Sequence, residues 1–249
     1  MSFNQSDLQQ LLALLGVDAT LIPGHALSTT ELPPPLEERA ALIVRLDLMN
    51  TKPPIWRRLR LASDLTLEEL HTIIQVTMGW MNMHLHSFDS WIPNSGKEVK
   101  VHLTTRYLES EGEGEGLLGE WDVAVSQFLK NTGDRLSYTY DFGDDWRHQI
   151  RLEKVEPWVT GSPQAECIAG KRACPPEDCG GPWNFQDFLD GAKRWVRTNP
   201  APDDEWGWLQ KEFDPEEFDL SAVNADLLMV GKGGFDEMKL GELLGGIDE

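Results

Sequence analysis

The sequence has little positive charge for its length of 249 residues. It contains 22 lysines and arginines against 42 aspartates and glutamates, which gives a formal net charge of −20. A negative field of this size repels phosphate backbones and anionic membrane surfaces. The charge therefore argues against nucleic acid and membranes as partners, and a protein partner or a metal ion suits it better.

Long apolar runs and paired cysteines are also missing. No stretch approaches the roughly 20 apolar residues of a transmembrane helix, and the N-terminal residues lack the basic start of a signal peptide. The three cysteines, Cys167, Cys174 and Cys179, are odd in number and confined to one segment. A secreted disulfide framework has a different pattern, so we expect a reduced, cytoplasmic protein.

Familiar catalytic signatures are absent as well. The sequence has no phosphate-binding loop, no dinucleotide fingerprint and no serine–histidine–aspartate phrase. Hydrophobic residues nevertheless make up 40% of the chain, and ten of its residues are tryptophan. This is enough for a substantial core, so the composition predicts a folded protein and excludes wholesale disorder.

Alternating apolar and polar residues predict several strands. The pattern has a period of two over residues 42–48 and 55–61, which indicates two antiparallel strands joined by a turn. Short strands are expected within residues 84–103, and residues 138–152 predict a hairpin with a Gly-Asp turn. Strands and helices do not alternate one for one. We therefore expect an α+β fold, an antiparallel sheet with helices packed on it.

Helix signals are clearest after the second predicted strand. Thr66 and Glu69 have the spacing of a capping box, and Gly79 supplies a stop signal. Apolar spacing predicts a second helix over residues 185–196, and a further helix is expected to begin near Asp214-Pro215.

The chain divides into three parts by composition. Residues 1–37 predict an N-terminal helical appendage with a proline-rich linker, and residues 38–230 form the expected α+β domain. Within that domain, residues 161–182 are rich in proline, glycine and cysteine and are expected to form a loop. Residues 231–249 predict a flexible acidic tail.

Three polar segments could carry chemistry, namely residues 80–88, 140–148 and 167–181. The phrases YDFGDDWRH and CPPEDCGG within them, together with the later FDPEEF, resemble the plasmid Ri ORF-three-like family, whose members also occur as passengers of bacterial transposons. The resemblance covers roughly residues 38–230. It implies an α+β fold but no settled reaction. Some members are labelled resolvase-like. This sequence does not support such a role, because it shows no serine-recombinase arrangement and no basic DNA-binding helix.

His84 and His86 are one residue apart, so in a strand both imidazoles would project from one face and could bind one metal ion. Cys167 and Cys179 could complete a four-ligand zinc site. The alternative is structural, with one histidine packed under an aromatic ring and the other facing water. The cysteines contain no C-x2-C pair, so an ordinary zinc knuckle is not indicated.

Acidic residues crowd the predicted hairpin turn. Local hydrogen bonding favours aspartate in turns and accounts for Asp144. It accounts less well for Asp141, which the pattern places inside the strand, where a bound cation or a shared proton would relieve like charges. His148 shares a strand face with core residues and is expected to be a hydrogen-bonded core histidine. The candidate binding residues are Asp141, Asp144, Asp145, Trp146, His148, Glu177 and Asp178.

A basic stripe lies on the second predicted strand, where Arg58 and Arg60 share a face with Trp56. Such a stripe could hold a phosphate or stack on a base. Given the net charge, a solvated strand face that pairs with acids such as Asp47 is the preferred interpretation.

Three functions remain open. The favoured hypothesis is a non-enzymatic binding or accessory module on mobile or plasmid DNA, with a protein partner. The first alternative is a metal-dependent hydrolase whose ligands come from the histidine, aspartate and cysteine residues, with a divalent metal such as zinc. The second alternative is nucleic-acid binding through the basic stripe.

Overall fold

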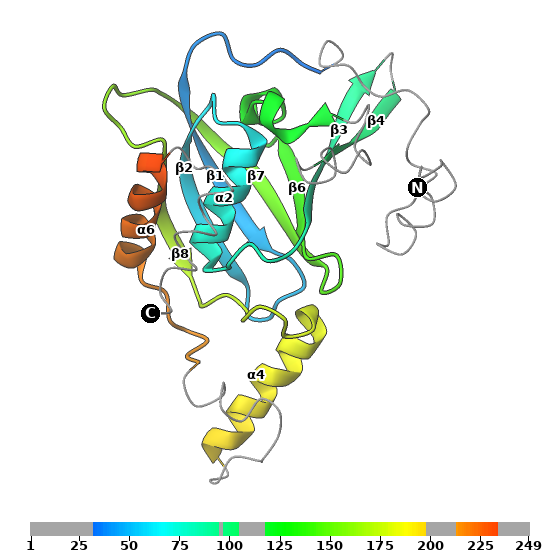
Figure 1. The fold of residues 1–249 in the computed structure, drawn as a ribbon, viewed down its shortest axis with the longest axis vertical. Coiled ribbons are helices and arrows are strands. Elements are labelled where there is room, and N and C mark those ends of the chain that lie inside the picture. The colour runs from blue at the N-terminus through cyan, green and yellow to red at the C-terminus, as the bar shows by residue number, and fades with distance from the viewer. Residues whose placement is uncertain (1–31, 95–96, 105–117, 198–212, 234–249) are drawn as a thin grey trace, which may run out of the picture.

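The computed structural model describes residues 32–94, 97–104, 118–197 and 213–233. The predicted N-terminal helix and nearly all of the acidic tail lie outside these ranges. The described residues form a single sheet with helices against one face and beyond one end (Figure 1). Among them, no helix is long and apolar enough to cross a bilayer.

The sheet has eight strands in the order β5-β4-β3-β6-β7-β1-β2-β8. Neighbouring strands are antiparallel, except that β4 and β5 are parallel. The predicted α+β fold is therefore confirmed. The strand bounds are β1 Ala40–Leu48, β2 Ile55–Ala62, β3 His86–Asn94, β4 Lys97–Thr104, β5 Leu118–Gly119, β6 Arg135–Tyr140, β7 Trp146–Pro157 and β8 Ala165–Lys171.

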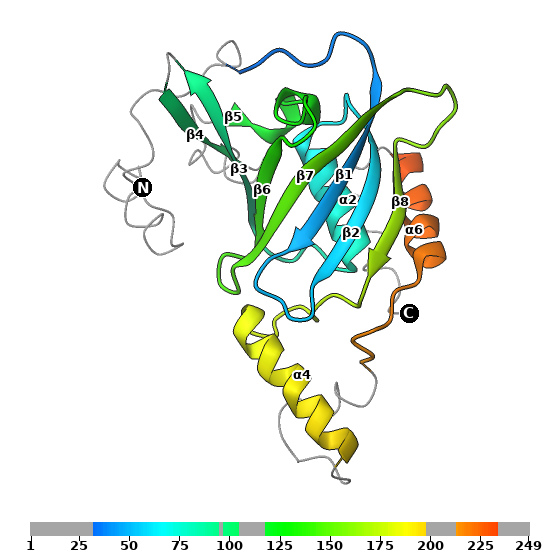
Figure 2. The same ribbon diagram turned by 180° about the vertical axis from the view of Figure 1, so that it is seen from behind.

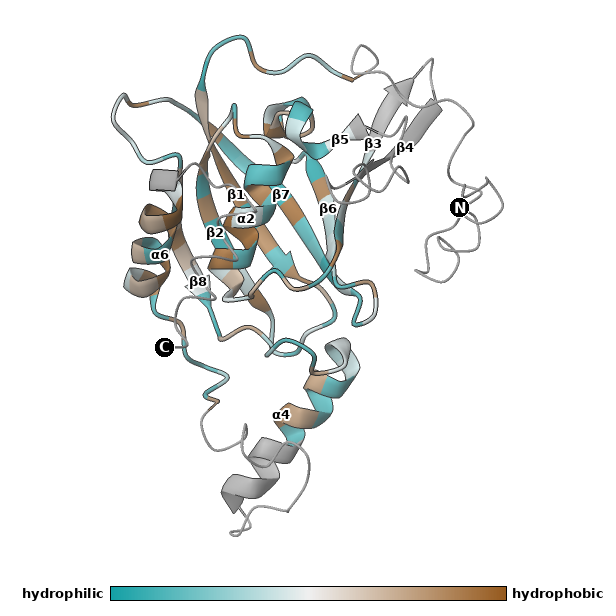
Figure 3. Cartoon of the chain, viewed as in Figure 1, coloured by the Kyte–Doolittle hydropathy of each residue, from teal (hydrophilic) through white to brown (hydrophobic). Residues whose placement is uncertain are grey.

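The alternation that predicted the strands also sets the two faces of the sheet. Hydrophobic and hydrophilic residues alternate along β1, β2 and β7 (Figure 3). Val44, Leu46 and Leu61 have no exposed surface and pack into the core that the sheet shares with helix α2 (Leu67–Met78). One face of the sheet is thus covered, and the polar face is left for other contacts.

Helix α2 begins and ends where the sequence signals predicted. The Thr66 hydroxyl accepts the N–H of Glu69 at 3.1 Å, and the Glu69 carboxylate accepts the N–H of Thr66 at 2.8 Å. Gly79 ends the helix with a φ of 79°, a left-handed conformation that glycine adopts without steric cost. The predicted capping box is confirmed.

Replacing Thr66 with alanine should lower the free energy of unfolding by about 1 kcal/mol, because the N–H of Glu69 loses its acceptor. Urea denaturation measures the difference. Thr160→Ala, an equal truncation in an exposed turn, should change stability by no more than about 0.5 kcal/mol. An equal loss in both variants would show that the cap contributes nothing.

The remaining helices are α4 (Gly181–Arg197), α6 (Leu220–Gly233) and two short 3₁₀ helices, η3 (Glu120–Asp122) and η4 (Val125–Gln127). The prediction of a helix starting near Asp214-Pro215 was wrong, because the Asp214 carboxylate accepts the N–H of Glu216 at 2.9 Å in a turn. Helix α6 starts later, where the Asp219 carboxylate caps it by accepting the N–H of Ser221 at 2.8 Å.

Strand β8 lies inside residues 161–182, which were predicted to form a loop. Its sequence, AECIAGK, has little apolar alternation to announce a strand. The strand pairs with β2 on one side. On its other side the Asn224 side-chain amide of α6 binds both backbone groups of Cys167 at 2.8 Å, so a side chain satisfies the polar groups of this sheet edge.

Candidate functional site

The three polar segments meet at one end of the sheet, next to the start of α4 (Figure 1). The Trp80 indole N–H donates to a backbone carbonyl in the third segment at 2.9 Å. The Tyr140 hydroxyl donates to Glu177 at 2.7 Å, and the N–H of Gly180 donates to Asp144 at 3.0 Å. We call this region the motif cluster, which comprises residues 80–86, 140–145 and 174–181.

The hairpin turn explains why Asp141 is acidic. The sequence pattern predicted that Asp141 lies inside the strand. Strand β6 instead ends at Tyr140, so Asp141 follows the strand. Its φ is 53°, a left-handed conformation that aspartate tolerates better than most residues. One carboxylate oxygen accepts the N–H groups of Gly143 and Asp144, at 2.9 and 3.2 Å. The other oxygen, Oδ2, faces His84.

The paired glycines of the third segment allow it to approach the hairpin closely. Gly180 and Gly181 both have a φ of 80°. A Cβ atom on Gly181 would lie 2.5 Å from the backbone oxygen of Asp144, so a larger residue there would push the loop away from the hairpin. Burial, and secondarily the nearby charge of Asp141, raises the pKa of the Asp144 carboxyl.

Tyr140 and Glu177 fix the backbone of the first segment. The Tyr140 hydroxyl accepts the N–H of Met83 at 3.0 Å, and Glu177 Oε1 accepts the N–H of Met81 at 3.0 Å. Burial raises the pKa of Tyr140, and its hydrogen bond to Glu177 raises it further. The hydroxyl therefore stays protonated and donates to the carboxylate. This arrangement holds the chain around His84 in place.

His84 lies between two carboxylates that come from the other two segments. Its Nε2 atom is 3.0 Å from Asp178 Oδ1 and 3.7 Å from Asp141 Oδ2. The Nε2 atom is buried and forms no well-aligned hydrogen bond with the described residues, although the Asp178 carboxylate lies within ion-pair distance. Within the described ranges, these three side chains are the one group of histidine, cysteine, aspartate or glutamate residues whose donor atoms lie close enough together, within 4.8 Å, to hold a metal ion.

The four metal ligands predicted from the sequence do not come together. His84 precedes strand β3, so it does not share a strand face with His86. The His86 Nε2 atom lies 2.8 Å from Glu120 in the core. Cys167 belongs to β8, which is separated from β3 by four strands. Burial raises the pKa of the Cys179 thiol to about 12, which opposes the thiolate that a metal requires.

The predicted binding residues fall into three groups. Asp141, Asp144, Glu177 and Asp178 lie in the motif cluster, where two of them approach His84 and the other two hold segments together through hydrogen bonds. Asp145 instead forms an exposed ion pair with Arg147 at 2.8 Å. The other two members, Trp146 and His148, are buried in the core.

His148 points into the core, as its strand position predicted. Its Nδ1 atom lies 3.1 Å from the carbonyl of Trp146, whereas Nε2 has no hydrogen-bond partner among the described residues. Burial lowers the pKa of this imidazole to about 3. We expected both ring nitrogens to be hydrogen-bonded, and among the described residues only Nδ1 has a partner.

A buried polar network beneath the motif cluster escaped the sequence analysis. The rings of His71 and His86 stack with centroids 3.4 Å apart. His71 also lies 2.8 Å from the Tyr138 hydroxyl, which accepts from Gln75 at 3.0 Å. The sequence holds only a weak sign of this network. His71 and Gln75 are one helical turn apart in α2, so they form a polar pair on one face of the helix, and that face is fully buried.

The comparisons with known proteins agree with the motifs. Residues 40–222 match the family model described as plasmid pRiA4b ORF-3-like protein. The chain is 32% identical to the uncharacterized protein y4hQ of Sinorhizobium fredii (strain NBRC 101917 / NGR234) over 187 residues, which are 74% of this chain and 90% of that protein.

A similar solved structure is the crystal structure of the protein of unknown function MM3350 from Methanosarcina mazei Go1. It aligns with a TM-score of 0.60 and 32% sequence identity, and the match covers 74% of this chain and 97% of that one.

Proposed function

The chain belongs to the plasmid pRiA4b ORF-3-like protein family, and from that premise we propose that it is a metal-binding accessory module. His84, Asp141 and Asp178 hold a divalent metal ion of the zinc class. The ion joins the three segments that the family motifs define. In this proposal the metal orders a binding surface and does not support catalysis.

The position of the His84 nitrogen carries the proposal. It is buried between two carboxylates without a well-aligned hydrogen bond, and a metal ion would give all three groups a common partner. In a tetrahedral zinc site with bonds near 2.0–2.1 Å, neighbouring donor atoms lie about 3.3 Å apart. The separations of 3.0 and 3.7 Å from His84 Nε2 to the two carboxylates bracket that value. The cation would also relieve the repulsion between Asp141 and Asp178.

The surroundings of His84 favour a protein partner. Met81 and Met83 are 52% and 70% exposed, although their backbone N–H groups are held by Glu177 and Tyr140. Flexible methionine side chains on a fixed backbone suit a surface that packs against another protein. All three cysteines are free thiols, which is consistent with our proposal of a cytoplasmic location.

The metal content of the purified protein tests the proposal. Protein prepared without chelator should contain about one equivalent of metal, and chelation should lower its melting temperature. His84→Ala should weaken zinc binding by about 100-fold in calorimetric titration, because an essential ligand is lost. Asp145→Asn, in the same turn but outside the ligand set, is the matched control. Less than about a tenth of an equivalent of metal, with no effect of chelator, would refute the site.

A metal-dependent hydrolase is the second candidate function. Three protein ligands leave a fourth zinc position for water, and the Asp178 side chain is 77% exposed, so solvent can reach it. His84 does not line either of two surface cavities, one formed by residues between Glu217 and Asn224 and the other by residues around Phe185. The binding module is preferred because exposed Met81 and Met83 flank the site. Zinc-dependent hydrolysis of model phosphodiesters or esters that disappears in His84→Ala would favour the hydrolase instead.

A further inference from the structure

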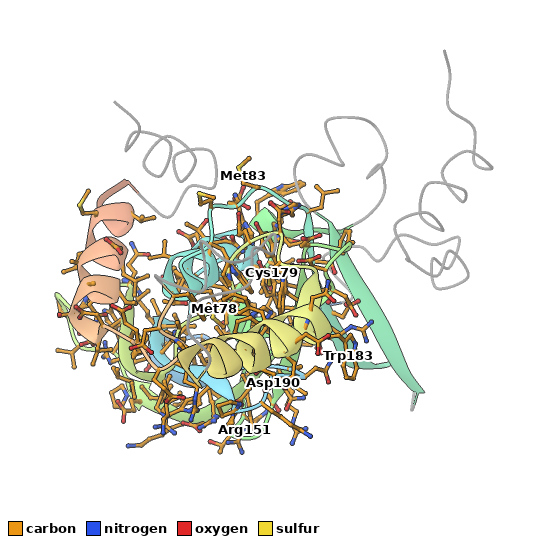
Figure 4. The ribbon with its side chains drawn as sticks, turned by 90° about the horizontal axis from the view of Figure 1, so that it is seen from below. Met78, Met83, Arg151, Cys179, Trp183 and Asp190 are labelled. Atoms are coloured by element: carbon orange, nitrogen blue, oxygen red, sulfur yellow. The ribbon has the colours of Figure 1, made fainter. Side chains whose placement is uncertain are left out.

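The face of the sheet opposite α2 is uncovered in the described part of the chain. Figure 2 shows β7, β1 and β2 side by side with no helix in front of them. Their outward side chains come from the polar half of each alternating pattern. This face is separate from the motif cluster, because Arg151 and Met83 lie on opposite sides of the molecule (Figure 4).

The strand register places four arginines in one line across this face. Arg135 of β6 pairs with Arg151 of β7, which pairs with Arg45 of β1, which pairs with Arg58 of β2. Adjacent strands lie about 4.8 Å apart, so the line extends over about 14 Å. We call these four residues the arginine row. The sequence analysis had seen only Arg58 and its neighbours on one strand.

Like charges directly opposite each other destabilise a sheet, and the row is only partly neutralised. Glu153 lies 2.7 Å from Arg58 and 3.3 Å from Arg151. Asp47 lies 2.8 Å from Arg45. Two carboxylates thus pair with three of the four guanidinium groups. Within the row and these partners, the positive charges outnumber the negative charges by two.

The neighbouring side chains suit a ligand with phosphates and bases. The Trp56 ring lies beside the row, with the Arg45 and Arg58 guanidinium groups 4.4 and 5.5 Å from its centroid. The next register line carries Ser137 and Gln149, which offer a hydroxyl and an amide. Two more acidic residues lie toward the edges of the sheet, Asp89 on β3 and Glu166 on β8.

The strongly negative total does not contradict a local positive surface. Residues 203–249 contain 14 acids and three bases, a net charge of −11, so they account for more than half of the −20 of the chain. The arginine row belongs to the other part of the sequence. Its field falls off within about 10 Å at ordinary salt, so nearby groups decide what it attracts.

We infer that the arginine row binds single-stranded nucleic acid, with the guanidinium groups on phosphates and Trp56 near the bases. Arginine forks bind phosphate oxygens in pairs, and a flat open sheet with an aromatic ring accepts unpaired bases. Trp56, whose ring the Arg45 and Arg58 guanidinium groups already contact, adds an aromatic surface that an acidic protein segment would not need. This inference goes beyond the metal-binding proposal and uses none of its residues.

Fluorescence anisotropy with labelled oligothymidylate of about 20 nucleotides, and with oligouridylate of the same length, tests the inference. The wild-type protein should bind either oligonucleotide, with affinity that falls as salt rises. Arg135→Gln/Arg151→Gln should weaken binding by about tenfold or more. Because this double variant removes a like-charge pair, its melting temperature should stay equal or rise.

The matched control is Lys52→Gln/Lys130→Gln, which removes two positive charges away from the row and should retain wild-type affinity. Zinc titration of the Arg135→Gln/Arg151→Gln variant should be unchanged, so failure of one proposal is distinguishable from failure of the other. Absence of oligonucleotide binding at low salt would overturn the inference. Equal affinity of wild type and the arginine variant, or binding of polyglutamate in place of oligonucleotide, would overturn it too.

Discussion

Replacing Trp80 with alanine should lower the free energy of unfolding by about 3–5 kcal/mol, the largest effect that we expect from a single substitution. The side chain is 2% exposed and stacks on Tyr140 with ring centroids 5.1 Å apart. It also meets His148 edge-on at 5.4 Å, and its indole N–H donates to Pro175. The substitution therefore removes core packing and a hydrogen bond to the third segment together.

Two further variants separate these contributions in urea or thermal denaturation. Trp80→Phe keeps an aromatic ring but loses the N–H donor, so it should cost less, about 1–2 kcal/mol. Trp183→Ala truncates a tryptophan that is 79% exposed on α4 (Figure 4) and should change stability by no more than about 0.5 kcal/mol. A similar small loss for Trp80→Ala and Trp183→Ala would mean that the third segment does not depend on Trp80.

Trp80 also connects stability to the proposed metal site. The loop that it anchors at Pro175 carries Asp178, one of the three proposed ligands. Loosening that loop should weaken zinc binding even where the variant remains folded, by about tenfold, as is usual for residues that orient ligands. The contacts made by Trp80, Tyr140 and Asp144 thus hold the three segments at one place.

Much of the fold could be predicted from local patterns. The period of two in β1, β2 and β7 depends only on burial of one face, and the capping box at Thr66 depends on residues three apart. Strand β8 could not be predicted in this way. Its pairing with β2 and the contacts of Asn224 with Cys167 are long-range, and its own residues have little strand pattern.

The meeting of the three polar segments could be predicted, but the side chains that approach one another there could not. The motifs pointed to these segments because polar residues there exceed what turns and cores require, and the structure brings the segments together. Choosing His84 over His86 needed the start of β3, which shifts one histidine out of the strand. Choosing Asp141 and Asp178 over the cysteines needed the loop geometry that brings Asp178 within 3.0 Å of His84.

The arginine row shows the same limit on a larger scale. Each of its members occupies an ordinary outward position on its own strand, where a single arginine is unremarkable. Alignment arises from the register of four strands, and residues 45, 58, 135 and 151 are far apart in the sequence. One-dimensional patterns contain no information on such pairing, so only the sheet topology reveals the concentration of charge.

The stability of the protein should fall between pH 7 and pH 5, by about 2 kcal/mol from His148, and His71 should add to the loss in the same direction. Burial lowers the pKa of His148 to about 3 and holds that of His71 well below its usual value. In the unfolded chain both titrate near pH 6.5. Below that pH the unfolded chain binds protons that the folded protein excludes. The stability is therefore fully present above pH 6.5 and is lost as the pH falls.

Below about pH 6, where the unfolded chain is mostly protonated at this residue, His148 should contribute close to 1.4 kcal/mol for every pH unit. The carboxyl groups of Glu69 and Asp144, whose pKa values are raised by burial, act in the opposite direction and chiefly at lower pH. The slope is therefore best measured above pH 5. Urea denaturation at several pH values, with chelator present to remove any metal contribution, gives the free energy of unfolding at each pH.

The His148→Phe variant separates the contribution of His148 to this pH dependence from that of His71. Phenylalanine keeps a ring against Trp80 and Tyr138 and removes the Nε2 atom that has no partner among the described residues. At pH 7 the loss of the Nδ1 hydrogen bond to the Trp146 carbonyl is offset by removal of the buried Nε2 atom, so the variant should lie within about 1 kcal/mol of the wild type. Its slope below about pH 6 should be smaller by about 1.4 kcal/mol per pH unit. An unchanged slope would show that His148 takes up its proton in the folded protein as readily as in the unfolded chain.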